Sequence, residues 1–95
     1  PQYIGPDAVV RESILCNGSE VFGTVLHSVV GLDCVVEEGA LVRDSVLQPG
    51  ARIRKGARVY RAIVGETAEV CAGAVFGSDE PDAEIVVSED SGIIR

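Results

Sequence analysis

The stretch VEEGALVRDSVLQPGARIRKGARVYRAIV, residues 36 to 64, decides the fold because its second half repeats its first. Large aliphatic residues recur at a distance of seventeen positions, in steps of six, five and six residues. The matching pairs are Val36 and Ile53, Val42 and Val59, and Leu47 and Val64. The series extends along the chain from Ile4 to Phe76. A fixed period of this kind indicates stacked units that bury their apolar sides against one another.

The six-residue steps also share a corner. Their fourth residue is Gly or Asp, which tolerate the left-handed backbone of a sharp turn, and Thr67 is the one departure. Their fifth residue is always small, as expected where the chain turns inward and space is tight. These small residues are Ala8, Ser19, Cys34, Ala40, Ala51, Ala57, Ala68 and Ala74.

Three short strands per turn, each with one inward aliphatic side chain, predict a triangular prism. We therefore expect an all-β fold, a parallel β-helix of hexapeptide repeats with four to five triangular coils about 4.8 Å apart. Hexapeptide prisms of this type are left-handed, and the resemblance to them implies the same hand here. We expect the β-helix over residues 1–76, followed by an acidic loop and a short C-terminal cap over residues 77–95.

The five-residue side of the prism has a feature of its own. The sequence of this side occurs four times, as VRESIL, VLHSVV, VRDSVL and VYRAIV, and each copy ends in two aliphatic residues. The first of these two residues precedes an inward position, so the alternation of strand side chains points it outward. The outward residues are Ile14, Val29, Val46 and Ile63. We call this row the aliphatic ridge and interpret it as a contact surface; cover by the C-terminal tail is the alternative.

The amino-acid composition excludes several classes of protein. The chain has 95 residues, of which 46% are hydrophobic and only 4% aromatic, which favours strands packed from small aliphatic side chains. A net charge of −7 argues against a general nucleic-acid binder. No apolar run approaches the roughly 18 residues of a membrane span. Three widely spaced cysteines without a C-x-x-C pair favour reduced thiols in a cytoplasmic protein. Without an initiator Met or a signal peptide, we expect a fragment or a processed chain.

Six of the eight basic residues lie between positions 43 and 61. They could hold a phosphorylated small molecule, or they could form ion pairs between neighbouring coils. Three pairs are seventeen residues apart and therefore predict such a charge ladder: Glu37 with Arg54, Glu38 with Lys55, and Asp44 with Arg61. Arg52 and Arg58 lie outside these three pairs, so they are the candidate residues for binding an anionic effector.

Catalytic signatures are sparse. There is no G-x-S-x-G motif, P-loop or G-x-G-x-x-G motif, and we predict neither catalytic residues nor a metal site in this chain. His27 is the only histidine, so three histidine ligands for a metal are excluded. It could act as the general base of a hexapeptide acyltransferase, or it could be a surface residue in an irregular, shortened turn.

Residues 3–70, from YIGPDAVV to GETAEV, resemble the C-terminal domain of bacterial glucose-1-phosphate adenylyltransferase (ADP-glucose pyrophosphorylase). The segment VFGTVLHSVV, residues 21–30, is similar to that family's shortened turn after the first coil. The tail DAEIVVSEDSGIIR, residues 82–95, is similar to its terminal segment. The family makes ADP-glucose and pyrophosphate from ATP and glucose-1-phosphate for glycogen synthesis.

The resemblance implies a regulatory and oligomerisation domain without catalytic residues or cofactor of its own. In that family a separate N-terminal nucleotidyltransferase domain holds the Mg²⁺, the ATP and the Gly-rich nucleotide loop. The implied partners are this domain, three further copies in a homotetramer, and effectors such as fructose-1,6-bisphosphate, AMP or phosphate. One departure concerns effector binding, because Glu84 and Ile85 stand where some members carry arginines. A stand-alone acyltransferase using His27 and a purely structural assembly module remain the alternatives.

Overall fold

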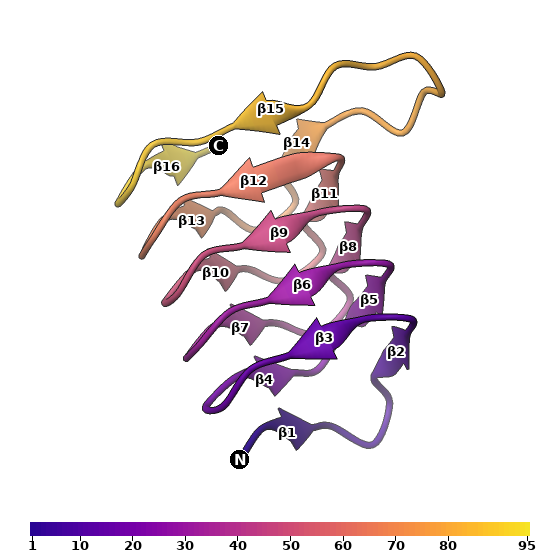
Figure 1. Ribbon diagram of the computed structural model, residues 1–95, viewed down its shortest axis with the longest axis vertical. Helices are drawn as coiled ribbons and strands as arrows, with labels where there is room; N and C mark the ends of the chain where they lie inside the picture. The colour runs from indigo at the N-terminus through magenta and orange to yellow at the C-terminus, as the bar shows by residue number, and fades with distance from the viewer.

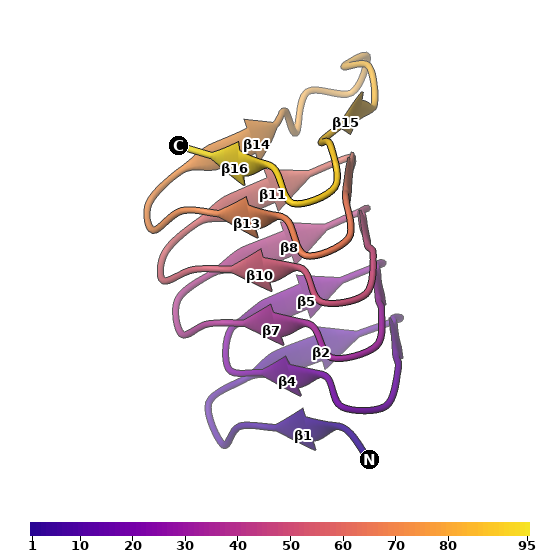
Figure 2. The same cartoon turned by 90° about the vertical axis from the view of Figure 1, so that its left-hand side faces the viewer.

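The computed structural model describes residues 1–95 and contains sixteen short strands and no helix. The strands form three parallel sheets, which are the faces of a triangular prism (Figures 1 and 2). Face A holds β1 (Tyr3–Ile4), β4 (Glu20–Val21), β7 (Val35–Val36), β10 (Arg52–Ile53), β13 (Glu69–Val70) and β16 (Ile93–Ile94). Face B holds β2 (Val9–Arg11), β5 (Thr24–Leu26), β8 (Leu41–Arg43), β11 (Arg58–Tyr60) and β14 (Val75–Gly77). Face C holds β3 (Ile14–Leu15), β6 (Val29–Val30), β9 (Val46–Leu47), β12 (Ala62–Val64) and β15 (Val86–Val87).

Each coil consists of one strand from each face, so β1 to β3 form coil 1 and β13 to β15 form coil 5. In Figure 1 the near strands β3, β6, β9, β12 and β15 run from right to left as the chain climbs, which is a left-handed course. The predicted fold class, a left-handed parallel β-helix, is confirmed. No helix in the structure has the length and apolar character needed to cross a membrane.

The core is a set of stacked aliphatic columns. The pairing of strands aligns Val25 with Val42, Val42 with Val59 and Val59 with Phe76, as the period of seventeen predicts. Val25, Val42 and Val59 have no exposed surface, whereas Ile4 in coil 1 is 48% exposed. Burial is therefore complete in the middle coils and incomplete in the first one, which has a neighbour on one side only.

The corners follow the pattern read from the sequence. Ala51, Ala57 and Ala68, at the fifth position of their steps, have no exposed surface, so the corner leaves room only for a small side chain. Gly50 and Gly56, at the fourth position, have φ values of 77° and 68°, in the left-handed region that favours glycine.

The corners between faces B and C use a different device, a column of serines. Ser28 and Ser45 are each 3% exposed. Each of their hydroxyl groups donates to a carbonyl two residues earlier and accepts from the backbone N–H of the next coil. Ser13 does the same at the start of the column. These three hydroxyl groups therefore satisfy backbone groups where the chain turns, and the N–H groups of Ser45 and Ala62 among them are buried.

Two departures from the period shape the surface. Between β4 and β5 only Phe22 and Gly23 remain of the usual corner, and in Figure 2 this turn lies inside those above and below it. This is the shortened turn expected at residues 21–30. Between β14 and β15 the chain makes a longer excursion over residues 78–85.

The C-terminal tail adds further strands to the prism. β15 pairs with β12, and β16 pairs with β13, both in parallel. The predicted cap therefore continues two of the three faces at this end of the molecule (Figure 1).

Candidate functional site

The aliphatic ridge lies on the outside of face C. Its residues Ile14, Val29, Val46 and Ile63 are aligned by the strand pairing, and Val87 of the tail extends the row by one position. Ile14 and Val87 are 63% and 66% exposed, and the three residues between them are half-buried. The outward orientation is thus as predicted.

The tail does not cover the ridge. Val86 and Val87 lie beside Ala62 and Ile63 in the same sheet, so the tail prolongs the apolar row instead of packing across it. The alternative explanation of the ridge is therefore wrong. A continuous row of aliphatic side chains that are exposed or half-exposed is typical of a protein contact surface.

The predicted charge ladder forms at one of its three rungs. The Arg54 side chain donates to Glu37 Oε2 at 3.0 Å and to Glu69 Oε2 at 2.8 Å. The pairing of Glu38 with Lys55 is wrong, because Glu37 accepts the Lys55 backbone N–H and neither predicted partner forms an ion pair.

The pairing of Asp44 with Arg61 is also wrong. Asp44 faces His27 and Arg43, and Arg61 donates to the carbonyl groups of Glu80 and Pro81. The side chain of Arg61 therefore bonds to the loop 78–85 and not to Asp44 of the preceding coil. Sequence distance alone did not reveal this competition.

The two arginines proposed for effector binding lie on different faces. Arg52 is an outward residue of β10 on face A, and Arg58 is an outward residue of β11 on face B. Arg58 lines a recess and its Nη1 lies 3.5 Å from the Tyr60 hydroxyl group, whereas Arg52 makes no side-chain hydrogen bond or ion pair. The structure does not bring them into one cluster.

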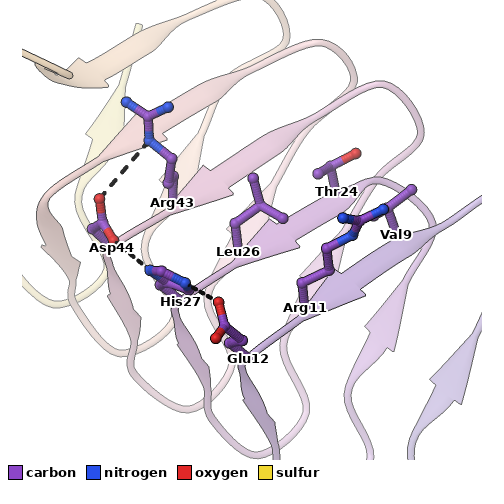
Figure 3. Close-up of a pocket in the computed structure, with 8 residues that line it drawn as sticks. All are labelled: Val9, Arg11, Glu12, Thr24, Leu26, His27, Arg43 and Asp44. Carbon is purple, nitrogen blue, oxygen red and sulfur yellow. Dashed lines mark hydrogen bonds and ion pairs between the residues drawn. The ribbon is translucent and has the colours of Figure 1, made fainter.

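A cluster that sequence reasoning missed lies on face B, in a recess of about 560 Å³. The recess is open to solvent, and Figure 3 shows the side chains that line it. The residues that line it are Val9, Arg11, Glu12, Thr24, Leu26, His27, Arg43 and Asp44. Its corner residues Glu12, His27 and Asp44 are fifteen and seventeen positions apart, and this spacing could have indicated that they stack.

Three basic side chains surround the apolar floor of this face B recess. Arg11 forms no ion pair and points toward Val9 and Thr24 (Figure 3). Arg43 lies 3.8 Å from Asp44 and 3.7 Å from Asp79, beyond ordinary hydrogen-bond distance. A guanidinium group without a tight partner can bind a carboxylate or a phosphate through two parallel hydrogen bonds.

The third basic group, His27, is held between two carboxylates. Its Nε2 hydrogen-bonds to Glu12, and its Nδ1 lies 3.6 Å from Asp44 Oδ1. The hydrogen bond and the charge of Glu12 raise the pKa of His27 above its ordinary value, and Asp44 adds to the effect. Both ring nitrogens of His27 therefore face carboxylates, which leaves neither of them free to take a proton from a substrate hydroxyl group. The geometry therefore disfavours an acyltransferase that depends on His27.

A second recess, of about 320 Å³, lies where the shortened turn leaves out part of the corner. Asp7 of coil 1, Glu38 and Gly39 of coil 3, and Arg58 line it. Neither carboxylate forms an ion pair. We call this recess the slot.

The cysteines are free thiols. Cys34 has no exposed surface, and burial raises the pKa of its thiol above the ordinary value, which makes it less reactive. No group of three or more His, Cys, Asp or Glu side chains is arranged to hold a metal ion.

Comparisons with known proteins identify the family of this chain. The family model described as GlmU-like, C-terminal hexapeptide, matches residues 4–95. Glucose-1-phosphate adenylyltransferases from Bacillus anthracis and from Bacillus mycoides (strain KBAB4) are 39% identical to this chain over 87 residues. The match covers 92% of this chain and 23% of each relative, in the C-terminal region. The resemblance stated from the sequence is therefore confirmed, for a chain that spans about a quarter of these relatives.

Among solved structures, the acetyltransferase domain of PglB from Neisseria gonorrhoeae FA1090 aligns with this chain. The alignment covers 93% of this chain and 55% of that domain, with 26% sequence identity and a TM-score of 0.39.

Proposed function

The chain belongs to the family of GlmU-like C-terminal hexapeptide domains, and we propose that it is the assembly and regulatory domain of a glucose-1-phosphate adenylyltransferase. The observation that carries this proposal is the 39% identity to such enzymes over 92% of the chain. In the proposed enzyme, ATP and glucose-1-phosphate react to ADP-glucose and pyrophosphate in a separate N-terminal domain. That domain would hold the ATP and Mg²⁺, and the enzyme would act in the cytoplasm.

Assembly is proposed to use the aliphatic ridge. Five aligned aliphatic side chains, from Ile14 to Val87, offer an apolar strip that a second copy or the catalytic domain could cover. Burial of apolar surface contributes about 25 cal/mol per Å², so such a strip supplies a driving force for association.

The ridge predicts a specific loss of assembly. Replacing Val46 by Asp places a carboxylate in the middle of the strip, and we expect the chain's association constant to fall by at least about tenfold. Sedimentation equilibrium over a wide concentration range measures it. The matched control is Val75→Asp, an equally drastic change at a 59% exposed position on face B. Equal association of the two variants, or a wild-type chain that is monomeric throughout, would contradict the role of the ridge.

Regulation is proposed to use the recess on face B. Arg11 and Arg43 could bind the phosphate of a sugar-phosphate or nucleotide effector above the apolar side chains of Val9 and Leu26. Arg52 and Arg58, the sites inferred from the sequence, are the second choice because they lie on separate faces.

Mixing experiments test the whole proposal. The chain is added to a separately produced catalytic domain of a relative, and ADP-glucose synthesis is measured with fructose-1,6-bisphosphate, AMP or phosphate. We expect the chain to bind the domain and to change the response to at least one effector, and Arg11→Ala to weaken this change more than Arg52→Ala. If the chain neither binds the catalytic domain nor changes its response to any effector, the proposal is wrong. Binding without any effector response would favour a purely structural assembly module.

A further inference from the structure

The slot exists because coil 2 is short. Regular corners between faces A and B contain four residues between their strands, for example Glu37 to Ala40, whereas coil 2 has only Phe22 and Gly23 there. Gly23 lies directly under coil 3, since a Cβ atom at this position would come within 2.5 Å of the Ala40 carbonyl oxygen. The corners of coils 1 and 3 therefore face each other across a recess that Phe22, Gly23 and Thr24 of coil 2 also line.

This omission interrupts a ladder of backbone hydrogen bonds. At the same corner of the higher coils, the Gly56 N–H donates to the Glu38 carbonyl, and the Gly73 N–H donates to the Lys55 carbonyl. Gly39 is the equivalent donor in coil 3, and its N–H has no hydrogen-bond partner. Pro6 is the equivalent acceptor in coil 1, and its carbonyl also has none.

The missing rung has the dimensions and the polarity of a polypeptide backbone. Coils 1 and 3 are separated by two coil spacings of about 4.8 Å each, which leaves room for one extended chain. Such a chain would accept from the Gly39 N–H and donate to the Pro6 carbonyl, as strands do when they add to an incomplete sheet.

The charges at the slot indicate which side chain the occupant carries. Asp7 and Glu38 line the slot without ion pairs, so they form a negative rim. Arg58, the only basic residue of the lining, is within reach of the Tyr60 hydroxyl group. A lysine or arginine of the occupant would meet both free carboxylates.

We propose that the slot left by the shortened turn binds a short extended segment of a partner polypeptide that carries a basic side chain. The backbone of this segment completes the rung between Pro6 and Gly39, and its basic group lies between Asp7 and Glu38. The inference does not depend on the enzyme proposed above, because it rests on the hydrogen bonds and charges of this chain alone.

Amide NMR of the labelled chain tests the proposal. The probes are two capped peptides, acetyl-Gly-Lys-Gly-amide and acetyl-Gly-Glu-Gly-amide, together with inorganic phosphate. We expect the lysine peptide to shift the Gly39 amide signal downfield, with smaller changes confined to the lining of the slot. The glutamate peptide should bind at least about fivefold more weakly because of the negative rim.

Two variants sharpen the test. The double variant Asp7→Asn with Glu38→Gln should weaken the lysine peptide about tenfold. The matched control, Asp82→Asn with Glu84→Gln, removes the same charge from the loop 78–85 and should leave binding unchanged. A third variant fills the slot by replacing Gly23 with the tripeptide Glu-Gly-Ala, which restores a full corner and should abolish binding.

Three results would overturn the proposal. The first is an unmoved Gly39 signal up to the solubility limit of the lysine peptide. The second is equal binding of the two peptides, or of the lysine peptide to the double variant and its control. The third is a stronger shift of Gly39 and Arg58 by phosphate than by the peptide, which would assign the slot to a small anion. If the variant with the tripeptide at Gly23 does not fold, the comparison of the double variant with its control still shows whether the slot binds the lysine peptide.

Discussion

At the scale of single residues, the corners concentrate the backbone strain. Seven residues other than glycine have a positive φ, which costs free energy because the Cβ atom crowds the following carbonyl. They are Glu12, His27, Asp33, Asp44, Arg61, Thr67 and Ser91. Thr67, with φ 53°, is the most unusual of them, since a β-branched side chain is rare in this region.

Replacing Thr67 by Gly should therefore stabilise the chain. Relief of the strain is worth about 1–2 kcal/mol, and the greater freedom of glycine in the unfolded state offsets about half of it, so a net gain of about 0.5–1 kcal/mol is expected. Urea unfolding measures it. The control Thr24→Gly, in the extended strand β5, should instead lose about 1 kcal/mol. Equal effects of the two substitutions would contradict the argument.

His27 makes the stability depend on pH. Glu12 raises the pKa of His27 in the folded chain above its ordinary value of 6.5, so the folded state favours the protonated form. The resulting stability is fully present below pH 6.5 and is lost as the pH rises through the folded pKa. An NMR titration of the imidazole should show the raised pKa, and Glu12→Gln should move it back toward 6.5. A His27 pKa at or below 6.5 in the wild type would refute the ion pair.

At the scale of strands and corners, the serine column stabilises the junction of faces B and C. Ser45→Ala leaves the buried N–H of Ala62 without its acceptor, and we expect a loss of about 1–3 kcal/mol in the free energy of unfolding. Ser13→Ala should cost less, because the Ser13 hydroxyl is more accessible to water, which can replace it. Chemical denaturation of both variants measures the difference, and a larger loss at Ser13 would argue against the role of burial.

The sequence predicted the strands well because one rule governs them all. Alternating side chains in every coil made Val42 an inward residue and Val46 an outward one, and the structure agrees. The charge pairs were predicted less accurately than the strands. Asp44 pairs with His27 at a corner, and Arg61 binds the loop 78–85, and the period of seventeen describes neither contact. The slot was not predicted, because it arises where neighbouring coils differ in length and not from any residue type. The face B recess was not predicted either, because it is formed jointly by side chains from three successive coils.

At the scale of the whole molecule, stability should vary along the prism. Each coil contacts only its neighbours, and coil 1 has one neighbour and partly exposed core residues. We therefore expect backbone amides of β1 to β3 to exchange with solvent at least about tenfold faster than those of β7 to β12. Hydrogen exchange followed by NMR measures these rates. Uniform rates along the prism would mean that the coils open together.

The unequal length of coil 2 also bears on how the chain finds its native pairing. Coils of identical length could align one repeat out of step and still match apolar residues with apolar residues, which would trap the folding chain. From Val21 to Val36 the chain advances fifteen residues, whereas from Val36 to Ile53 it advances seventeen. A misaligned stack would place the short coil where a full one belongs and would leave a corner unsupported. The shorter length of coil 2 thus distinguishes the native alignment from misaligned ones, so an otherwise repetitive sequence specifies a single alignment.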